Sequence, residues 1–183
     1  MNIKEKQKKF FKEAKEEFAY KNIMQTPSLD KVVLNTGVGK ASKDKKRLAL
    51  INDRLVKISG QKPVQRKAKK SIAAFKVREG EVVGYQVTLR GERMFGFLDK
   101  FVDVTLPRTK DFRGLPLKSI DEMGNCTIGL KEHTIFPETS DEELRDIFGL
   151  SVTIVTTSDN KKETAAFLKY LGFPFKKEEE NKK

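Results

Sequence analysis

Residues 82–90 are the segment that most restricts what this chain can fold into. Along it, large apolar residues alternate with polar residues or glycine: Val83, Tyr85, Val87 and Leu89 against Gly84, Gln86, Thr88 and Arg90. Successive side chains of a β-strand point to opposite faces of its sheet, so this pattern predicts a strand with one buried face. The other face carries hydrogen-bonding groups or no side chain at all. The chain is therefore expected to contain a sheet that is covered on one side only.

The spacing of apolar residues predicts four helices around this strand. They cover residues 3–20, 44–59 and 93–105 and a last segment through Ala165, Leu168 and Leu171. The helix over 44–59 has the clearest limits, because Ser42 or Asp44 can cap its start and Gly60 can end it. Further strands are expected at 31–36 and 150–156, and residues 63–71 are expected to be extended.

From residue 31 onward these elements follow the order β-α-β-β-α-β and close with a helix. This is the split βαβ arrangement. We therefore predict an α+β fold: a mostly antiparallel sheet with helices on one face and an open binding face, plus N-terminal and C-terminal helices. A chain of 183 residues is expected to form a single domain. Residues 1–21 would be its N-terminal helix, and residues 176–183 a charged, disordered tail.

The charge of the chain is large and unevenly placed. The net charge is +12, but residues 1–118 carry 29 basic and 13 acidic side chains, a balance of +16. The remaining residues carry 9 basic and 13 acidic side chains, a balance of −4. Such a balance suits nucleic acid or an anionic membrane surface as partner. A chance gradient of composition is the alternative explanation.

The sequence carries no sign of export or membrane insertion. No apolar run approaches the roughly 20 residues of a membrane span. The lysine-rich start, residues 1–9, is not followed by the apolar stretch of a secretory signal. The lone Cys126 cannot form an internal disulfide, which fits a reducing compartment. These features predict a cytoplasmic protein with no membrane partner.

Two basic clusters lie at the ends of the helix predicted over residues 44–59: the first precedes or opens the helix, and the second follows it. No acidic residue occurs between Gly60 and Phe75, and like charges so close together repel one another unless phosphates relieve them. We expect these clusters to contact the RNA or DNA backbone. Their members are Lys40, Lys43, Lys45, Lys46 and Arg47, then Lys62, Arg66, Lys67, Lys69 and Lys70.

Two glycines follow the strand expected over residues 31–36. The segment from Asn35 to Lys40 lacks the GxxxxGK[ST] spacing of a nucleotide P-loop and the third glycine of a dinucleotide fingerprint. One interpretation is a tight turn that needs the permissive backbone of Gly37 and Gly39. The other is a strand-end turn whose backbone N–H groups approach an RNA phosphate.

The sequence offers little to a catalytic or metal-binding hypothesis. His133 is the only histidine and Cys126 the only cysteine, so a two-histidine or cysteine-rich metal site is excluded. A Cys–His nucleophile pair stays formally open, but a surface or loop position for His133 is the simpler expectation. We expect no enzyme activity, no cofactor and no metal. A generic nucleic-acid-binding module is the alternative to a specific one.

The absence of aromatic residues from the polar face of residues 82–90 restricts the kind of RNA partner. Many single-strand binders stack unpaired bases on exposed aromatic side chains of a sheet. Small hydrogen-bonding side chains suit the ribose and phosphate groups of a folded RNA better. A folded RNA is therefore the expected partner.

A series of short sequence motifs resembles those of a known protein family. The chain resembles the L-five family of bacterial large-subunit ribosomal proteins across about residues 22–175, nearly its whole length. Each motif is short, but the order in which the motifs follow one another is specific to this family. They are Val33-Leu34-Asn35 with Gly37-Val38-Gly39, Ser59-Gly60-Gln61-Lys62-Pro63, Lys69-Lys70-Ser71-Ile72-Ala73 with Phe75-Lys76, Val87-Thr88-Leu89-Arg90-Gly91 with Arg93-Met94, Leu106-Pro107-Arg108, Asp111-Phe112-Arg113-Gly114-Leu115, Ile135-Phe136-Pro137-Glu138, Thr156-Thr157 and Gly172-Phe173-Pro174-Phe175.

The resemblance implies a structural role in the large ribosomal subunit. Its expected partners are 5S rRNA, which such proteins help to seat in the central protuberance, 23S rRNA, P-site tRNA and other large-subunit proteins. The open sheet face and strand ends would bind 5S rRNA through Asn35, Gln61, Thr88 and Arg90. The loop over residues 71–84 would contact the tRNA through Phe75, Lys76 and Arg78.

Overall fold

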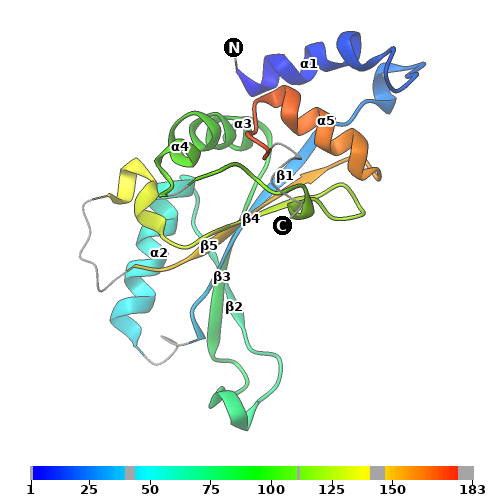
Figure 1. Ribbon diagram of the computed structural model, residues 1–183. Coiled ribbons are helices and arrows are strands. Elements are labelled where there is room, and N and C mark those ends of the chain that lie inside the picture. Colours follow the sequence, from blue (N-terminus) through cyan, green and yellow to red (C-terminus); the bar gives the residue numbers. More distant parts are fainter. Residues whose placement is uncertain (1, 40–43, 111, 141–146, 177–183) are drawn as a thin grey trace. The chain divides into compact units, whose positions relative to one another are not determined.

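The computed structural model describes residues 2–39, 44–110, 112–140 and 147–176. The described residues form five α-helices and five strands, and Figure 1 labels them. In chain order they are α1 (Ile3–Ala14), β1 (Leu29–Gly37), α2 (Lys45–Ser59), β2 (Val64–Lys67), β3 (Val82–Leu89), α3 (Gly91–Lys100), α4 (Leu106–Arg108), β4 (Cys126–Leu130), β5 (Leu150–Thr156) and α5 (Lys161–Leu171).

The five strands form one sheet in the order β2-β3-β1-β5-β4. Alternate residues are buried along β5, as Val152 and Ile154 illustrate, whereas all four residues of β2 are exposed. The predicted α+β fold with an open sheet is confirmed. One strand was missed: β4 adds a second strand between α3 and α5, so the order of labelled elements from residue 29 is β-α-β-β-α-α-β-β-α. None of the helices in the described part of the chain has the length and apolarity that a membrane crossing demands.

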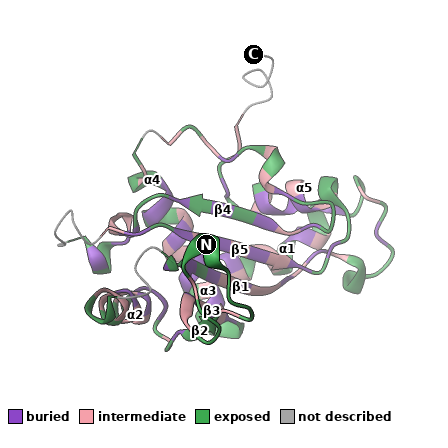
Figure 2. Cartoon of the chain, turned by 90° about the horizontal axis from the view of Figure 1, so that it is seen from below, coloured by how far each residue is buried: buried purple, intermediate pink, exposed green. Residues whose placement is uncertain are grey.

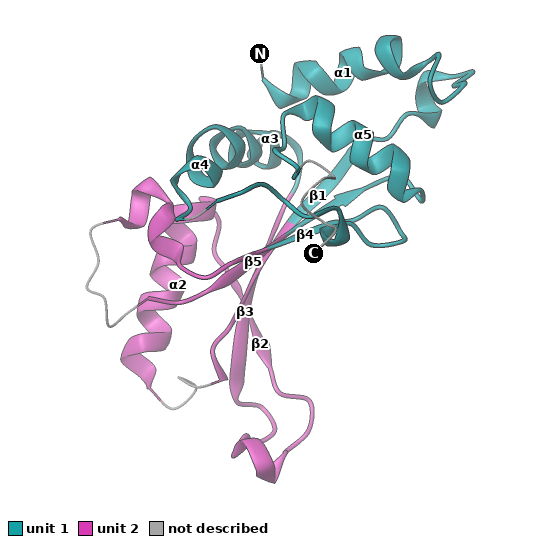
Figure 3. Cartoon of the chain, viewed as in Figure 1, with its two compact units in different colours: residues 1–32, 90–128, 153–183 teal, residues 33–89, 129–152 magenta. Residues whose placement is uncertain are grey.

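The chain divides into two compact units, each built from separate stretches of sequence (Figure 3). Unit 1 comprises residues 1–32, 90–128 and 153–183, and unit 2 comprises residues 33–89 and 129–152. Both contain parts of β1, β4 and β5, because these strands continue from one unit into the other. The expectation of a single domain stays a prediction.

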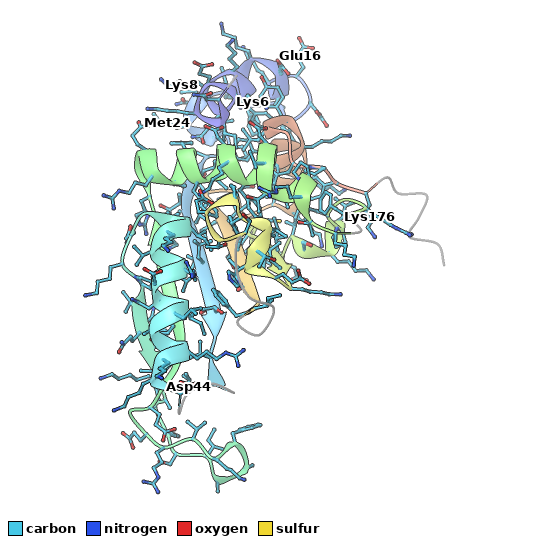
Figure 4. The ribbon with its side chains drawn as sticks, turned by 90° about the vertical axis from the view of Figure 1, so that its left-hand side faces the viewer. Lys6, Lys8, Glu16, Met24, Asp44 and Lys176 are labelled. Carbon is cyan, nitrogen blue, oxygen red and sulfur yellow. The ribbon has the colours of Figure 1, made fainter. Side chains whose placement is uncertain are left out.

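Unit 1 is held together by packing between α1 and α5. The ring of Phe10 in α1 meets that of Phe167 edge-on, with 5.1 Å between centroids. The Lys6 ammonium, labelled in Figure 4, donates to the carbonyl of Leu171 at 2.9 Å, where the last carbonyls of α5 lack helical partners. The helix predicted over residues 3–20 ends at Ala14, and turns follow it.

Unit 2 is built around α2, which packs on β3. Ile51, Leu55 and Ile58 recur at spacings of four and three and are buried against the sheet, while the opposite side of α2 is exposed (Figure 2). The carboxylate of Asp44 accepts from the backbone N–H groups of the first turn, at 3.0 and 3.2 Å. Gly60 ends the helix with a left-handed backbone (φ 66°). The limits predicted for this helix are therefore nearly those observed.

The helix expected over residues 93–105 is interrupted. α3 covers Gly91–Lys100, a π-helical segment follows over residues 101–105, and α4 adds one short turn that contains Pro107. The N–H of Leu106 donates to the carbonyl of Phe101, five residues back. Proline has no N–H to donate, so the backbone pattern changes where the helix approaches it.

Candidate nucleic-acid interface

The polar side chains of β1 and β3 in unit 2 lie on the sheet face away from α2. Asn35 is exposed between buried Leu34 and Thr36, and Thr88 is half-buried between the buried Val87 and Leu89. Figure 4 shows α2 crossing one side of these strands. We call the other side of unit 2, with Asn35, Val64, Arg66, Gly84, Gln86 and Thr88, the open face.

Arg66 is held on the open face by a neighbouring strand. β2 pairs antiparallel with β3, with Val64 opposite Gln86 and Arg66 opposite Gly84. The Nε of Arg66 donates to Oε1 of Gln86 at 2.6 Å. This contact leaves the terminal guanidinium nitrogens free of the Gln86 amide and limits the rotation of the side chain. The sequence placed Gln86 on the polar face but assigned it no role, because the register of β2 against β3 is not readable from the chain.

Gly84 lets the strands of the open face lie close together. A Cβ at this position would lie 2.9 Å from the carbonyl oxygen of Thr36 in β1, too close for a real contact. The hydroxyl of Thr36 in turn donates to the carbonyl of Gly149 at 2.6 Å. The hydroxyl of Ser151 donates to the carbonyl of Asn35 at 3.3 Å. The backbone of β1 around Asn35 is therefore held by β3 on one side and by residues 149–151 on the other.

Gln61 follows the C-terminal end of α2, and its backbone is fixed there by Ser59. The Ser59 hydroxyl accepts from the Gln61 N–H at 3.2 Å and lies 3.0 Å from the Gln61 carbonyl oxygen. The same hydroxyl donates to the carbonyl of Leu55 at 2.6 Å. The Gln61 side chain is half-buried and therefore still accessible.

The glycines at the end of β1, Gly37 within the strand and Gly39 beyond it, do not need a special backbone. Neither Gly37 nor Gly39 has a positive φ, and a Cβ on either would have open space around it. The interpretation as a tight turn that requires permissive glycines is therefore wrong. The other interpretation, a strand-end turn whose backbone N–H groups approach an RNA phosphate, stays a prediction. Lys40 and Lys43 lie outside the described residues.

The second basic cluster is spread along the molecule rather than gathered on one face. Lys62 lies beside α2, Lys67 ends β2 at an irregularity in the pairing, and Lys69 and Lys70 follow in the loop. All are exposed, and none has an acidic partner among the described residues. Only Arg66 of this cluster belongs to the open face.

The loop between β2 and β3 is an ordered hairpin end. It begins at Ala68, whose backbone N–H donates to the carbonyl of Glu81 at 2.8 Å, and a bridge joins Ile72 to Val77. Between them a short 3-10 helix presents the ring of Phe75, which is 75% exposed. Figure 1 shows this end projecting from the sheet. Lys76, with φ 52°, and Arg78 are accessible beside it.

Arg90 belongs to unit 1 and already has a partner. Its Nη1 lies 2.6 Å from Oδ1 of Asp30, in an exposed ion pair. Exposed pairs of this kind contribute little to stability, so a phosphate could compete for the guanidinium. The role expected for Arg90 in RNA binding stays a prediction.

The described residues do not support a catalytic pair of Cys126 and His133. Burial and then the charge of Asp121 raise the pKa of the Cys126 thiol to about 12, which is opposite to what a nucleophile needs. His133 is completely buried, stacked on Phe148 at 4.1 Å, and its Nδ1 accepts from the Phe148 backbone N–H. The expected surface position of His133 is therefore wrong. The described residues also contain no group of three or more potential metal ligands.

Two family models match the chain. The model described as "Ribosomal protein L5" covers residues 22–78, and the model for the C-terminus of the same ribosomal family covers residues 82–175. "Large ribosomal subunit protein uL5" of Desulfatibacillum aliphaticivorans is 53% identical over 162 residues, which are 88% of this chain and 90% of that protein. The protein of the same name from Streptococcus pneumoniae (strain Hungary19A-6) is 51% identical over the same shares of both chains. These matches confirm the resemblance read from the ordered motifs, and the chain belongs to the ribosomal protein L5 family.

Proposed function

We propose that this protein is a structural constituent of the large ribosomal subunit that binds 5S rRNA through the open face of unit 2. It would help to seat that RNA in the central protuberance, with 23S rRNA and other large-subunit proteins as further partners. The names of its relatives support a place in the large subunit. Members of this family are structural components, so the prediction that the chain is not an enzyme is confirmed.

The observation that carries this proposal is the composition of the open face. Asn35, Gln86 and Thr88 offer amide and hydroxyl groups, and Arg66 is oriented by Gln86. None of the open-face residues is aromatic, so bases cannot stack there as they do on many single-strand binders. Amide, hydroxyl and guanidinium groups match the ribose hydroxyls and phosphates of a folded RNA helix. The unpaired lysines around the face supply attraction without selecting a partner.

The test compares two open-face variants with a matched control in binding to 5S rRNA and to an unrelated RNA hairpin. Thr88→Ala and Asn35→Ala should each weaken 5S binding by roughly five- to tenfold, as expected for one lost hydrogen bond, and leave hairpin binding intact. Thr134→Ala removes a half-buried threonine of unit 2 outside the open face and should change neither affinity. Titrations between roughly 50 and 200 mM salt separate the charge-driven part of binding.

The proposal fails if 5S rRNA and the hairpin lose affinity equally with salt and with both substitutions. In that case only the removal of Lys67, Lys69 or Lys70 would matter, and the protein would be a generic nucleic-acid-binding module.

We propose in addition that the hairpin end over residues 71–84 contacts P-site tRNA through Phe75, Lys76 and Arg78. The exposed ring of Phe75 on a hydrogen-bonded turn supports this, since burying such a ring on RNA would remove it from water. Phe75→Ala should lower the protection of tRNA in chemical footprints of assembled ribosomes and leave 5S affinity unchanged. Met123→Ala, which removes another exposed apolar side chain, is the control. Unchanged footprints with Phe75→Ala would refute the contact.

A further inference from the structure

A groove of about 1280 Å³ lies in unit 1, between α1, α5 and the chain that follows α5. On the α1 side, the lining residues Phe10, Ala14 and Glu17 follow one another at spacings of four and three, which place them along one side of a helical path. On the other side, Ala166 and Tyr170 of α5 are four residues apart and share a side in the same way. Two helical surfaces that line one groove offer a place where a third helix can pack.

The lining of this groove is largely apolar and only partly covered. Phe10 is its buried part, since the ring packs against those of Phe167 and Tyr170, with 5.1 and 5.3 Å between centroids. Leu117 and Phe175, which also line the groove, are half-buried. Apolar side chains of a ligand would remove this surface from water, which favours binding. An amphipathic helix that lays its apolar side into a groove is one of the recurring ways in which proteins recognise one another.

The two sides of the groove carry opposite charges. Glu13 and Glu17 lie on the α1 side, whereas Lys169 of α5 and Lys176, which is labelled in Figure 4, lie on the other. The Glu13 carboxylate accepts a hydrogen bond from the hydroxyl of Tyr170 at 3.1 Å. Glu17, Lys169 and Lys176 form no ion pair with any described residue, so their charges stay available to a ligand. A ligand with cations along one flank and carboxylates along the other would complement both sides.

This charge pattern favours a protein over a nucleic acid as the ligand. An RNA backbone carries phosphates along its whole length, and Glu13 and Glu17 would repel them. An amphipathic helix can instead carry lysine or arginine on one flank of its apolar stripe and aspartate or glutamate on the other. Such a helix fits in one direction only, because turning it end for end would bring each flank against like charges. The groove therefore selects both the kind of partner and its orientation.

We propose that this groove binds an amphipathic helix of another protein. The apolar stripe of that helix packs on Leu117 and Phe175, and its basic flank lies against Glu17. Its acidic flank lies against Lys169 and Lys176. The proposal does not depend on the open face binding 5S rRNA, because every residue that lines the groove belongs to unit 1.

The experiment measures the fluorescence anisotropy of a labelled synthetic peptide with the full chain. This sorted peptide is a stapled helix of roughly 15–18 residues with leucines at helical spacing, lysines along one flank and glutamates along the other. A mixed peptide of the same length and composition, with lysine and glutamate alternating on both flanks, is the control for net charge and apolarity. The sorted peptide should bind roughly three- to tenfold more tightly, because part of the charges of the mixed peptide would meet like charges.

Variants that remove single charges locate the binding site. Glu17→Gln and Lys169→Gln should each weaken binding of the sorted peptide by roughly two- to fivefold, as expected for one lost exposed ion pair. Glu16→Gln and Lys162→Gln are the matched controls, because they remove the same charges from exposed residues of the same segments outside the groove lining. Neither control should change the affinity. Circular dichroism checks that each variant is folded, and Lys169→Gln supplies the readout if Glu17→Gln is not.

Three results would overturn the proposal: no measurable binding of the sorted peptide, equal affinity for the two peptides, or equal losses for each variant and its control. Displacement of the sorted peptide by an unrelated RNA hairpin, together with tighter hairpin binding by Glu17→Gln, would also overturn it, since nucleic acid would then occupy the groove. Failure of the open-face proposal is separate, because it is detected by Thr88→Ala with 5S rRNA as the ligand.

Discussion

Substitution of Gly84 by alanine tests whether close contact between β1 and β3 shapes the open face. The new Cβ would lie 2.9 Å from the carbonyl oxygen of Thr36, and that atom belongs to backbone, which cannot turn aside as a flexible side chain can. Relief requires the strands to shift, at a cost of about 1–3 kcal/mol. Alanine also regains roughly 0.5–1 kcal/mol that glycine loses as chain entropy on folding. The net expectation is a loss of about 1–2 kcal/mol in the free energy of unfolding, taking the middle of both ranges.

Gly129→Ala is the matched control for this experiment. Gly129 also lies within a strand of the sheet and is exposed, and a Cβ added to it would meet nothing within 4 Å. It should gain only the entropy contribution, about 0.5–1 kcal/mol. Urea unfolding followed by circular dichroism measures both variants, and their difference isolates the steric cost. A Gly84→Ala protein as stable as Gly129→Ala would refute the reasoning.

Three further results are expected. Asp44→Ala removes the cap of α2 and should lower the free energy of unfolding by about 1 kcal/mol in urea titrations, whereas an unchanged midpoint would mean that the cap is not formed in solution. The Arg90–Asp30 pair is exposed, so a double-mutant cycle should give a coupling of roughly 0–1 kcal/mol, and a larger value would show that the pair is more shielded than its geometry indicates. The pKa of the Cys126 thiol is raised from 9.0 to about 12, so this thiol should resist thiol reagents until the protein unfolds. Because the folded state holds the proton more tightly than the unfolded state, the contribution of Cys126 to stability is present below pH 9 and is lost between about pH 9 and 12. Rapid labelling of the native protein at pH 8 would contradict both statements.

Local signals were sufficient to predict the elements of unit 2 that carry the site. The limits of α2 were readable because the side chain of Asp44 and the backbone freedom of Gly60 act within a few residues of the helix ends. The two faces of β3 were readable because Tyr85, Val87 and Leu89 alternate with smaller or polar neighbours. Such features depend on sequence separations of one to four residues.

Features that depend on distant partners were not predictable. β4 was missed because it has only three buried residues, and because the glycines in and around it suggested a loop. The burial of His133 depends on Phe148, fifteen residues away, and nothing in the surrounding sequence indicates that contact. The orientation of Arg66 depends on the register that brings it to Gln86. Each of these contacts is made by tertiary pairing, which a single sequence does not encode in any local pattern.

The position of β2 has a consequence for the protein before it meets any partner. β2 stands at one end of the strand order, all four of its residues are exposed, and its pairing with β3 becomes irregular between Arg66 and Lys67. A sheet edge with free backbone groups is a template on which another chain can add a strand and start an aggregate. Two adjacent cations and an irregular edge oppose this, because a second copy would bring like charges together along a strand that does not present a regular ladder. The charges that would attract RNA therefore also oppose edge-to-edge pairing between copies of the chain.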